Sequence, residues 1–192
     1  MVKKWVLNVV RRKNNISDAD AVVLEYGLSK IFLFLEDAVL TMILGYLMGI
    51  IVESIMFQGF YTLLRMYAGG YHADTERKCK IYSGLVTVAS LTTIRFLPGR
   101  VWLLFFIALI ASIVVAVLSP VEAANKPLSD AERGIYHRKT VMIVAVADLI
   151  LLLSMVLGID AFFKPLMVGL LIVCFLMIIG VGSDKRLHKI RP

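Results

Sequence analysis

The sequence predicts an all-α integral membrane protein with about five to six membrane helices, and two observations lead to this fold class. First, 59% of the 192 residues are hydrophobic and 18% are charged, a balance more apolar than that of a soluble domain. Second, the apolar residues form separate runs, each close to the length that crosses a hydrocarbon core. The longest polar interval, 119–140, is too short to fold alone. We therefore expect a single multi-pass domain over 1–192.

Five apolar runs are expected to span the membrane. The run from Val101 to Leu118 carries no charge and has about the minimum length for a membrane helix. The run 81–97 is slightly short, but Arg95 stands near its end, where a long side chain can reach the interface. The five predicted spans are 38–57, 81–97, 101–118, 141–159 and 165–182.

Residues 1–37 are expected to form amphipathic N-terminal segments. In 1–15, apolar residues at helical spacing alternate with Lys and Arg, which favours a helix lying on anionic membrane lipid. A basic tail that only sets the orientation is an equal alternative, and no continuous apolar core of a secretion signal is present. Glu25 and Lys30 disfavour a lipid-facing span over 18–37. We expect a sixth, amphipathic membrane segment there, either a crossing or a re-entrant segment, with both termini in the cytoplasm.

The orientation follows from the basic residues of the short loops. The intervals 63–84, 119–140 and 183–192 each carry four Lys or Arg, whereas 98–100 and 160–164 carry one each. Alternating passage through the spans places the three basic intervals on one side, which the positive-inside rule makes cytoplasmic. We therefore expect a multi-pass protein of the cell membrane. No feature of the sequence predicts a nucleic-acid partner.

The polar interval "LLRMYAGGYHADTERKCKIYSG", residues 63–84, holds one of three histidines and one of two cysteines. On one continuous helix, His72 and Cys79 would be two turns and about 10 Å apart, too far for a hydrogen bond. Gly69 and Gly70 allow the chain to bend between them. Asp74 or Thr75 can then cap a new helix, and a cap is also the favoured role of Asp74 over orienting His72.

With such a bend, Cys79 would stand in the first turns of a helix. The helix dipole and the neighbouring basic residues would favour its thiolate, and His72 would accept the thiol proton as a general base. On the residues alone, an ordinary polar loop remains the favoured alternative. A zinc site is disfavoured because zinc needs about four ligands and no close-spaced cluster exists. We expect no metal and no cofactor.

The residues from Arg65 to Cys79 read R-x-x-A-G-G-Y-H-A-x-x-x-x-x-C. This pattern resembles the signature of the accessory gene regulator B (AgrB) family, membrane cysteine endopeptidases that process propeptides of cyclic quorum-sensing peptides in Gram-positive bacteria. The stretch "SPVEAANKPLS", 119–129, is similar to the family's Pro…Asn-Lys-Pro loop. The resemblance implies an AgrD-type propeptide as substrate and a catalytic interval over 58–80. It also permits a homodimer.

The resemblance implies a role for each matching residue. Cys79 would be the nucleophile and His72 its base, while Arg65 and Gly70 match positions that the family needs for activity. We interpret Gly70, with Gly69, as backbone geometry, and Arg65 as a guanidinium that orients a carboxylate or only sets orientation. The basic loop 119–140 would recruit the charged C-terminal part of the propeptide, unless its charges serve orientation alone; its four basic residues are Lys126, Arg133, Arg138 and Lys139.

The reaction that the resemblance implies is acyl transfer through a Cys79 thioester, followed by closure of a thiolactone or lactone. The main alternative is a non-enzymatic membrane protein, such as a transporter subunit, whose polar loop holds His72 and Cys79 without catalysis. A metal-dependent intramembrane protease fits less well, because the sequence lacks a His-Glu-x-x-His pair. Glu53, expected near the cytoplasmic end of its span, and Asp148, near the centre of its span, could serve structure as easily as function.

Overall fold

The computed structural model describes residues 18–71, 75–97, 101–122 and 128–190. Within these ranges the chain is helical, with one isolated backbone bridge between Gly69 and Val121 and no strand. The all-α prediction is confirmed for this part of the chain. The helices are α2 (Asp18–Leu47), α3 (Ile51–Ala68), α4 (Glu76–Phe96), α5 (Val101–Leu118), α6 (Asp130–Leu157) and α7 (Asp160–Ile190).

The chain divides into two compact units, Met1–Leu40 and Thr41–Pro192. In the first unit, α2 makes 18–40 helical, which agrees with the helical segment expected over 18–37. The predicted surface helix of 1–15 lies outside the described residues. The second unit contains the motif and the elements that support it.

The predicted span 38–57 is wrong as one continuous helix. α2 ends at Leu47 and α3 begins at Ile51, so the chain turns at 48–50 although the sequence stays apolar on both sides. Gly49 adopts φ 69°, a left-handed conformation that glycine reaches without steric cost. A Cβ on Gly45 would overlap the side chain of Ser54, so the glycine lets the two helices approach closely.

This turn also changes the position of Glu53. We expected Glu53 near the cytoplasmic end of its span, but it lies in the first turn of α3, directly after the turn at 48–50. The motif stands at the other end of α3. Glu53 therefore lies at the other end of α3 from the predicted active site.

The remaining apolar runs lie within helices except at their ends, where Leu97, Gly158 and Ile159 fall outside. The bounds of α5 are those predicted for the span 101–118, whereas α6 and α7 extend beyond their apolar runs into polar sequence. Residues 130–157 and 160–182 are long and apolar enough to cross a membrane, and 102–118 form a shorter apolar helix. A capping box between Ser129 and Glu132 starts α6, and Gly158 ends it at φ 69°. The total of six crossings stays a prediction.

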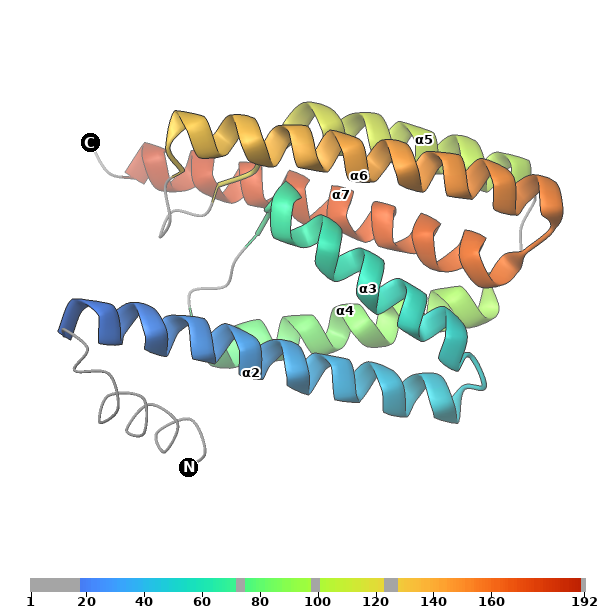
Figure 1. Cartoon of the computed structure of the whole chain (residues 1–192), viewed down its shortest axis with the longest axis horizontal. Helices are drawn as coiled ribbons and strands as arrows, with labels where there is room; N and C mark the ends of the chain where they lie inside the picture. The colour runs from blue at the N-terminus through green and yellow to red at the C-terminus, as the bar shows by residue number, and fades with distance from the viewer. Residues whose placement is uncertain (1–17, 72–74, 98–100, 123–127, 191–192) are drawn as a thin grey trace. The chain divides into compact units, whose positions relative to one another are not determined.

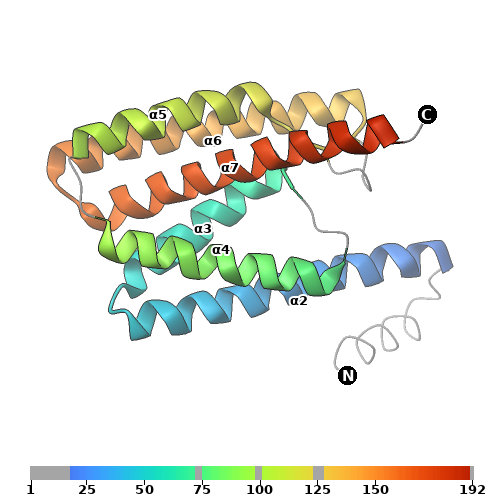
Figure 2. The same cartoon turned by 180° about the vertical axis from the view of Figure 1, so that it is seen from behind.

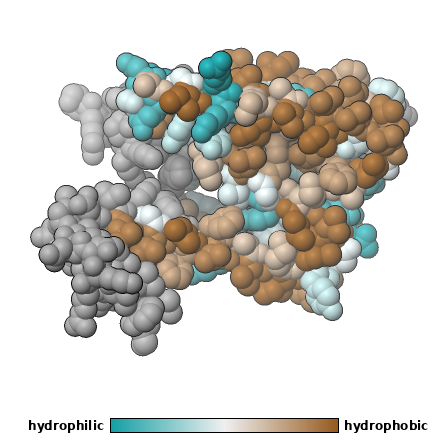
Figure 3. All heavy atoms as spheres, in the orientation of Figure 1, coloured by the Kyte–Doolittle hydropathy of each residue, from teal (hydrophilic) through white to brown (hydrophobic). Residues whose placement is uncertain are grey.

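Helix α7 is the centre of the second unit, where it packs against α3, α4, α5 and α6 (Figures 1 and 2). Its buried face includes Leu170, Val173 and Met177, which meet a core that also contains Phe57 and Leu64 of α3. Large apolar side chains remain exposed on the outer faces of α4, α5 and α6. Figure 3 shows the part of this hydrophobic surface that lies over α6. An apolar surface of this extent is typical of contact with lipid.

The helices of the second unit alternate in direction, so their connections gather at two ends (Figures 1 and 2). At one end, α3 and α5 finish and α4 and α6 begin. We call this the motif end, because it carries Arg65, Gly69, Gly70 and Cys79. The turn at 48–50 and the junction of α6 with α7 lie at the opposite end. Placing the motif end in the cytoplasm stays a prediction from the basic residues.

Candidate active site

The double glycine ends α3 in a turn that other residues could not form. Gly69 has φ 73° and Gly70 has φ 123°, both in the range that favours glycine. Space excludes side chains as well, because a Cβ on Gly69 would overlap the carbonyl oxygen of Val121. A Cβ on Gly70 would overlap Nη1 of Arg65. The expectation that these glycines adopt conformations closed to other residues is therefore confirmed.

Segments distant in the sequence hold this turn in place. Val121 donates its N–H to the carbonyl of Ala68 at 2.9 Å, and its own carbonyl accepts from the N–H of Gly70 at 3.2 Å. The N–H of Tyr71 donates to the carbonyl of Leu176 in α7 at 3.0 Å. A Cβ on Gly180, one turn further along α7, would lie 2.8 Å from the nitrogen of Tyr71. The chain leading to His72 is thus packed against α7 through backbone atoms.

Arg65 supports the same turn from inside. Its guanidinium donates hydrogen bonds to the carbonyls of Gly69 and Tyr71, and Tyr61, one helical turn earlier, is also hydrogen-bonded to it. The Arg65 guanidinium also interacts electrostatically with Cys79. Arginine remains protonated in proteins. Within the protein its partners are two backbone carbonyls and a phenol, and the expected roles, orienting a carboxylate or only setting orientation, stay predictions.

Cys79 lies in the first turn of α4, as predicted. Its N–H donates to the carbonyl of Thr75 at 3.0 Å, and Thr75 is the N-cap, whose hydroxyl accepts from the N–H of Lys78 at 3.3 Å. The favoured role of Asp74 as the cap is wrong, because Thr75 is the extended residue directly before the helix. Cys79 is a half-buried free thiol, and the helix N-terminus and Arg65 both bring positive charge toward it.

The bend expected between the histidine and the cysteine is present. Helix α3 ends at Ala68 and α4 begins at Glu76, so the two motif residues do not share a helix. His72 and Asp74 themselves lie outside the described residues, and the distance between His72 and Cys79 stays a prediction. The residue before His72 is described, however. The Tyr71 ring meets the Tyr82 ring of α4 edge to face, with centroids 6.2 Å apart and planes at 63°.

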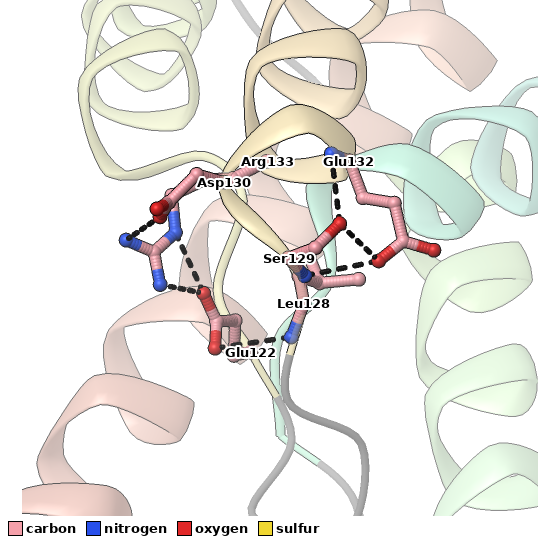
Figure 4. A network of polar contacts seen from close by, with 6 residues as sticks. All are labelled: Glu122, Leu128, Ser129, Asp130, Glu132 and Arg133. Atoms are coloured by element: carbon pink, nitrogen blue, oxygen red, sulfur yellow. Dashed lines mark hydrogen bonds and ion pairs between the residues drawn. The ribbon is translucent and has the colours of Figure 1, made fainter.

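Residues 119–122, which we call the strap, connect the glycine turn to α6. Nδ1 of His137 lies 3.2 Å from Oγ and 3.0 Å from the carbonyl oxygen of Ser119. Arg133 donates through Nε and Nη2 to Oε1 of Glu122, at 2.8 and 2.5 Å (Figure 4). With the bonds of Val121 to the turn, the strap holds the start of α6 against the motif.

Comparison with known proteins identifies the family. The sequence model described as Accessory gene regulator B matches residues 2–178. The chain belongs to the AgrB family. An AgrB-like protein of Lactiplantibacillus plantarum is 23% identical over 179 residues, which cover 92% of this chain and 86% of that protein. A second AgrB-like protein, from Clostridium perfringens, is 22% identical over 134 residues, covering 66% and 63%. No solved structure shows a significant match.

AgrB proteins are membrane proteins of agr quorum sensing that take part in processing a propeptide. Sequence reasoning found the glycines, Arg65 and Cys79, but it missed Val121, Leu176 and Gly180. Leu176 and Gly180 sit in an ordinary apolar run, where no local signal marks them. The Pro…Asn-Lys-Pro stretch that resembles AgrB was the one hint that the segment around Val121 matters.

The basic residues expected to bind substrate are in part engaged within the protein. Arg133 is paired with Glu122, and its Nη1 lies 3.8 Å from Asp130 (Figure 4). Nζ of Lys139 lies 4.7 Å from the centre of the Tyr67 ring. Arg138 is exposed, and Lys126 lies outside the described residues. Figure 3 shows hydrophilic atoms gathered near the start of α6.

Two further polar side chains, Asp148 and Cys174, lie within the apolar helices. Asp148 in α6 accepts a hydrogen bond of 2.7 Å from the hydroxyl of Ser112 in α5, which is a contact between packed helices. Cys174 is a half-buried free thiol of α7 that packs against the hydrophobic core. Among the described residues, no group of three His, Cys, Asp or Glu side chains gathers as a metal site. That a metal is not needed stays a prediction.

Proposed function

We propose that this AgrB-family protein is a membrane cysteine endopeptidase that removes the C-terminal part of an AgrD-type propeptide. The observation that carries the proposal is the position of Cys79. This thiol lies in the first turn of α4 and within the electrostatic influence of Arg65, whose guanidinium holds the turn that leads to His72. A helix N-terminus and a nearby guanidinium are the surroundings that favour a reactive thiolate.

In the first step, His72 accepts the proton of the Cys79 thiol, and the thiolate attacks the carbonyl carbon of the scissile peptide bond. The carbon–nitrogen bond then breaks, His72 returns the proton to the leaving amine, and the N-terminal part of the propeptide remains on Cys79 as a thioester. The N–H groups that begin α4 lack acceptors within the helix, which suits them to stabilise the oxyanion. Thr75 already occupies the N–H of Lys78.

In the second step, a cysteine or serine of the propeptide attacks the thioester. The new carbon–sulfur or carbon–oxygen bond closes a thiolactone or lactone, the bond to Cys79 breaks, and His72 takes the proton of the incoming group. Water competes with this attack, so a site poor in water favours ring closure over hydrolysis. The scheme uses no metal and no cofactor.

The basic start of α6 is proposed to capture the acidic C-terminal segment of the propeptide by electrostatic steering. The charge of Arg133 is already compensated by Glu122, so Arg138, Lys139 and Lys126 are expected to contribute more. We also propose that six helices cross the cell membrane of a Gram-positive-type bacterium, with the motif end in the cytoplasm. A homodimer is compatible with this arrangement.

The test is an intact-mass measurement on the purified protein after mixing with a candidate propeptide. We expect an adduct on Cys79 equal in mass to the N-terminal part of the propeptide. Cys79→Ala should abolish the adduct and Cys174→Ala, the matched control, should retain it. Full cleavage by Cys79→Ser, or neither adduct nor cleavage with several propeptides, would overturn the proposal and favour the non-enzymatic alternative.

A further inference from the structure

We propose that Tyr82 is a positioning residue that acts through Tyr71 to hold the start of α4, and with it Cys79, against the glycine turn. The inference rests on the proposed function and adds a residue outside the motif. Tyr82 lies three residues after Cys79 in α4, and residues at this spacing are neighbours on one helix face. Its ring meets that of Tyr71, the residue directly before His72. The contact therefore connects the helix of the nucleophile to the segment of the base.

Tyr71 is suited to transmit this contact because its backbone is fixed on both sides. Its N–H donates to Leu176 of α7, and its carbonyl accepts from the Arg65 guanidinium. Gly180 leaves room for the backbone to lie directly on α7. With both backbone groups held, the ring of Tyr71 is a rigid partner for Tyr82.

The start of α4, in contrast, has little burial to hold it. Arg77, Lys78, Ile81 and Tyr82 are exposed, Cys79 is half-buried, and Thr87 is the first residue of α4 with a described side chain that is fully buried. The Tyr82 side chain is 47% exposed, so packing in the hydrophobic core does not explain why an aromatic residue stands at this position. Edge-to-face packing of two rings supplies a directional contact where the hydrophobic core supplies none.

A contact of this kind is expected to matter for rate more than for substrate affinity. Displacement of a catalytic group by about 1 Å can lower a rate by roughly 100-fold, because the reacting atoms lose their alignment. If the start of α4 loses its contact with Tyr71, the Cys79 thiol is no longer held in one position for attack on the propeptide. Formation of the acyl-enzyme then slows, while capture of the propeptide by the basic start of α6 is unchanged.

The experiment compares Tyr82→Phe, Tyr82→Leu, Tyr71→Leu and the double variant Tyr71→Leu/Tyr82→Leu. The matched control is Tyr46→Leu, which removes a tyrosine that is 77% exposed near the opposite end of the helices. The single-turnover rate of acyl-enzyme formation is measured by intact mass over a range of propeptide concentrations. The thermal unfolding midpoint of each variant is measured in the same detergent.

We expect Tyr82→Phe and Tyr46→Leu to stay within about twofold of the unsubstituted protein, since the ring contact is kept in the first and untouched in the second. Tyr82→Leu should lower the maximal rate about 3- to 10-fold, with the half-saturating concentration changed less than twofold. The double variant should be no slower than the slower single variant, because both changes remove one contact.

The inference is overturned if Tyr82→Leu reacts at the unsubstituted rate, or if Tyr82→Phe is as slow as Tyr82→Leu, which would assign the role to the hydroxyl. It is also overturned if the half-saturating concentration rises while the maximal rate holds, because Tyr82 would then bind substrate. Because Tyr82 is exposed, its leucine variant should unfold at the unsubstituted midpoint even if Tyr71→Leu does not. If the unsubstituted protein and Tyr46→Leu form no acyl-enzyme, the proposed function fails and this inference with it.

Discussion

Gly70 and Arg65 share one small volume at the end of α3, where a Cβ on the glycine would overlap Nη1 of the guanidinium. The same guanidinium donates to the carbonyls of Gly69 and Tyr71, on either side of that glycine. The Arg65 guanidinium therefore occupies the space that a side chain at position 70 would need. The effects of substitutions at the two positions on activity should not be additive, because each substitution disrupts the same turn.

Gly70→Ala is expected to lower acyl-enzyme formation by about 100-fold or more, because a side chain at φ 123° is strained by roughly 1–3 kcal/mol and also displaces Arg65. The measurement is the single-turnover rate with a cognate propeptide. Gly59→Ala, within α3, is the control, since a Cβ there meets no atom within 4 Å. An active Gly70→Ala protein would contradict this account of the turn.

Arg65→Lys separates the hydrogen-bonding role of Arg65 from its charge. Lysine keeps the positive charge but lacks the planar fork that reaches two carbonyls at once. We expect a loss of about 1–3 kcal/mol in the free energy of unfolding, as buried carbonyls lose their donors, and loss of most cleavage activity. Denaturation in detergent and propeptide cleavage measure the two effects. Full activity with lysine would mean that charge alone is required.

Sidedness is testable with the native cysteine at the motif end. A membrane-impermeant maleimide should label Cys79 in inside-out vesicles of the Cys174→Ala variant and leave it unlabelled in intact cells, because basic loops remain in the cytoplasm. Leu157→Cys in a background lacking both native cysteines should show the reverse, since Leu157 is exposed at the end of α6 next to α7. Labelling of Cys79 in intact cells would invert the proposed topology.

Substrate capture by the basic start of α6 predicts different results for two neighbouring arginines. Arg138→Gln should raise the half-saturating propeptide concentration without changing the maximal rate, and higher salt should diminish the difference. Arg133→Gln should mainly lower the maximal rate, because it releases Glu122 and with it the strap. Titrations at low and high salt measure both parameters. An apparent affinity independent of salt would exclude electrostatic capture.

The sequence predicted helices better than it predicted where they turn. The run from Val101 to Leu118 became one helix with those bounds, because a charge-free run of that length has few alternatives. The run 38–57 was misread, since hydropathy is the same on both sides of Gly49 and does not register a reversal of the chain. Thr75 rather than Asp74 became the cap because the choice depends on where the backbone becomes extended.

The candidate site was predictable only in its local part. The spacing of Gly69, Gly70 and Cys79 indicated a bend followed by a helix start, which the structure confirms. The contribution of α7 could not be read from sequence, because Leu176 acts through its backbone carbonyl and Gly180 through the absence of a side chain. Neither property leaves a pattern in an apolar run.

The close packing of Gly69, Gly70 and Gly180 has a consequence for telling working enzymes from inactive copies within the family. A chain that retains the cysteine and histidine but carries a bulkier residue at the position of Gly180 should still insert and assemble its helices. The backbone before the histidine could no longer rest on the last helix, and the copy would be a pseudoenzyme. If the proposed function holds, a glycine at this position of α7 is therefore expected to accompany activity, together with the cysteine and histidine.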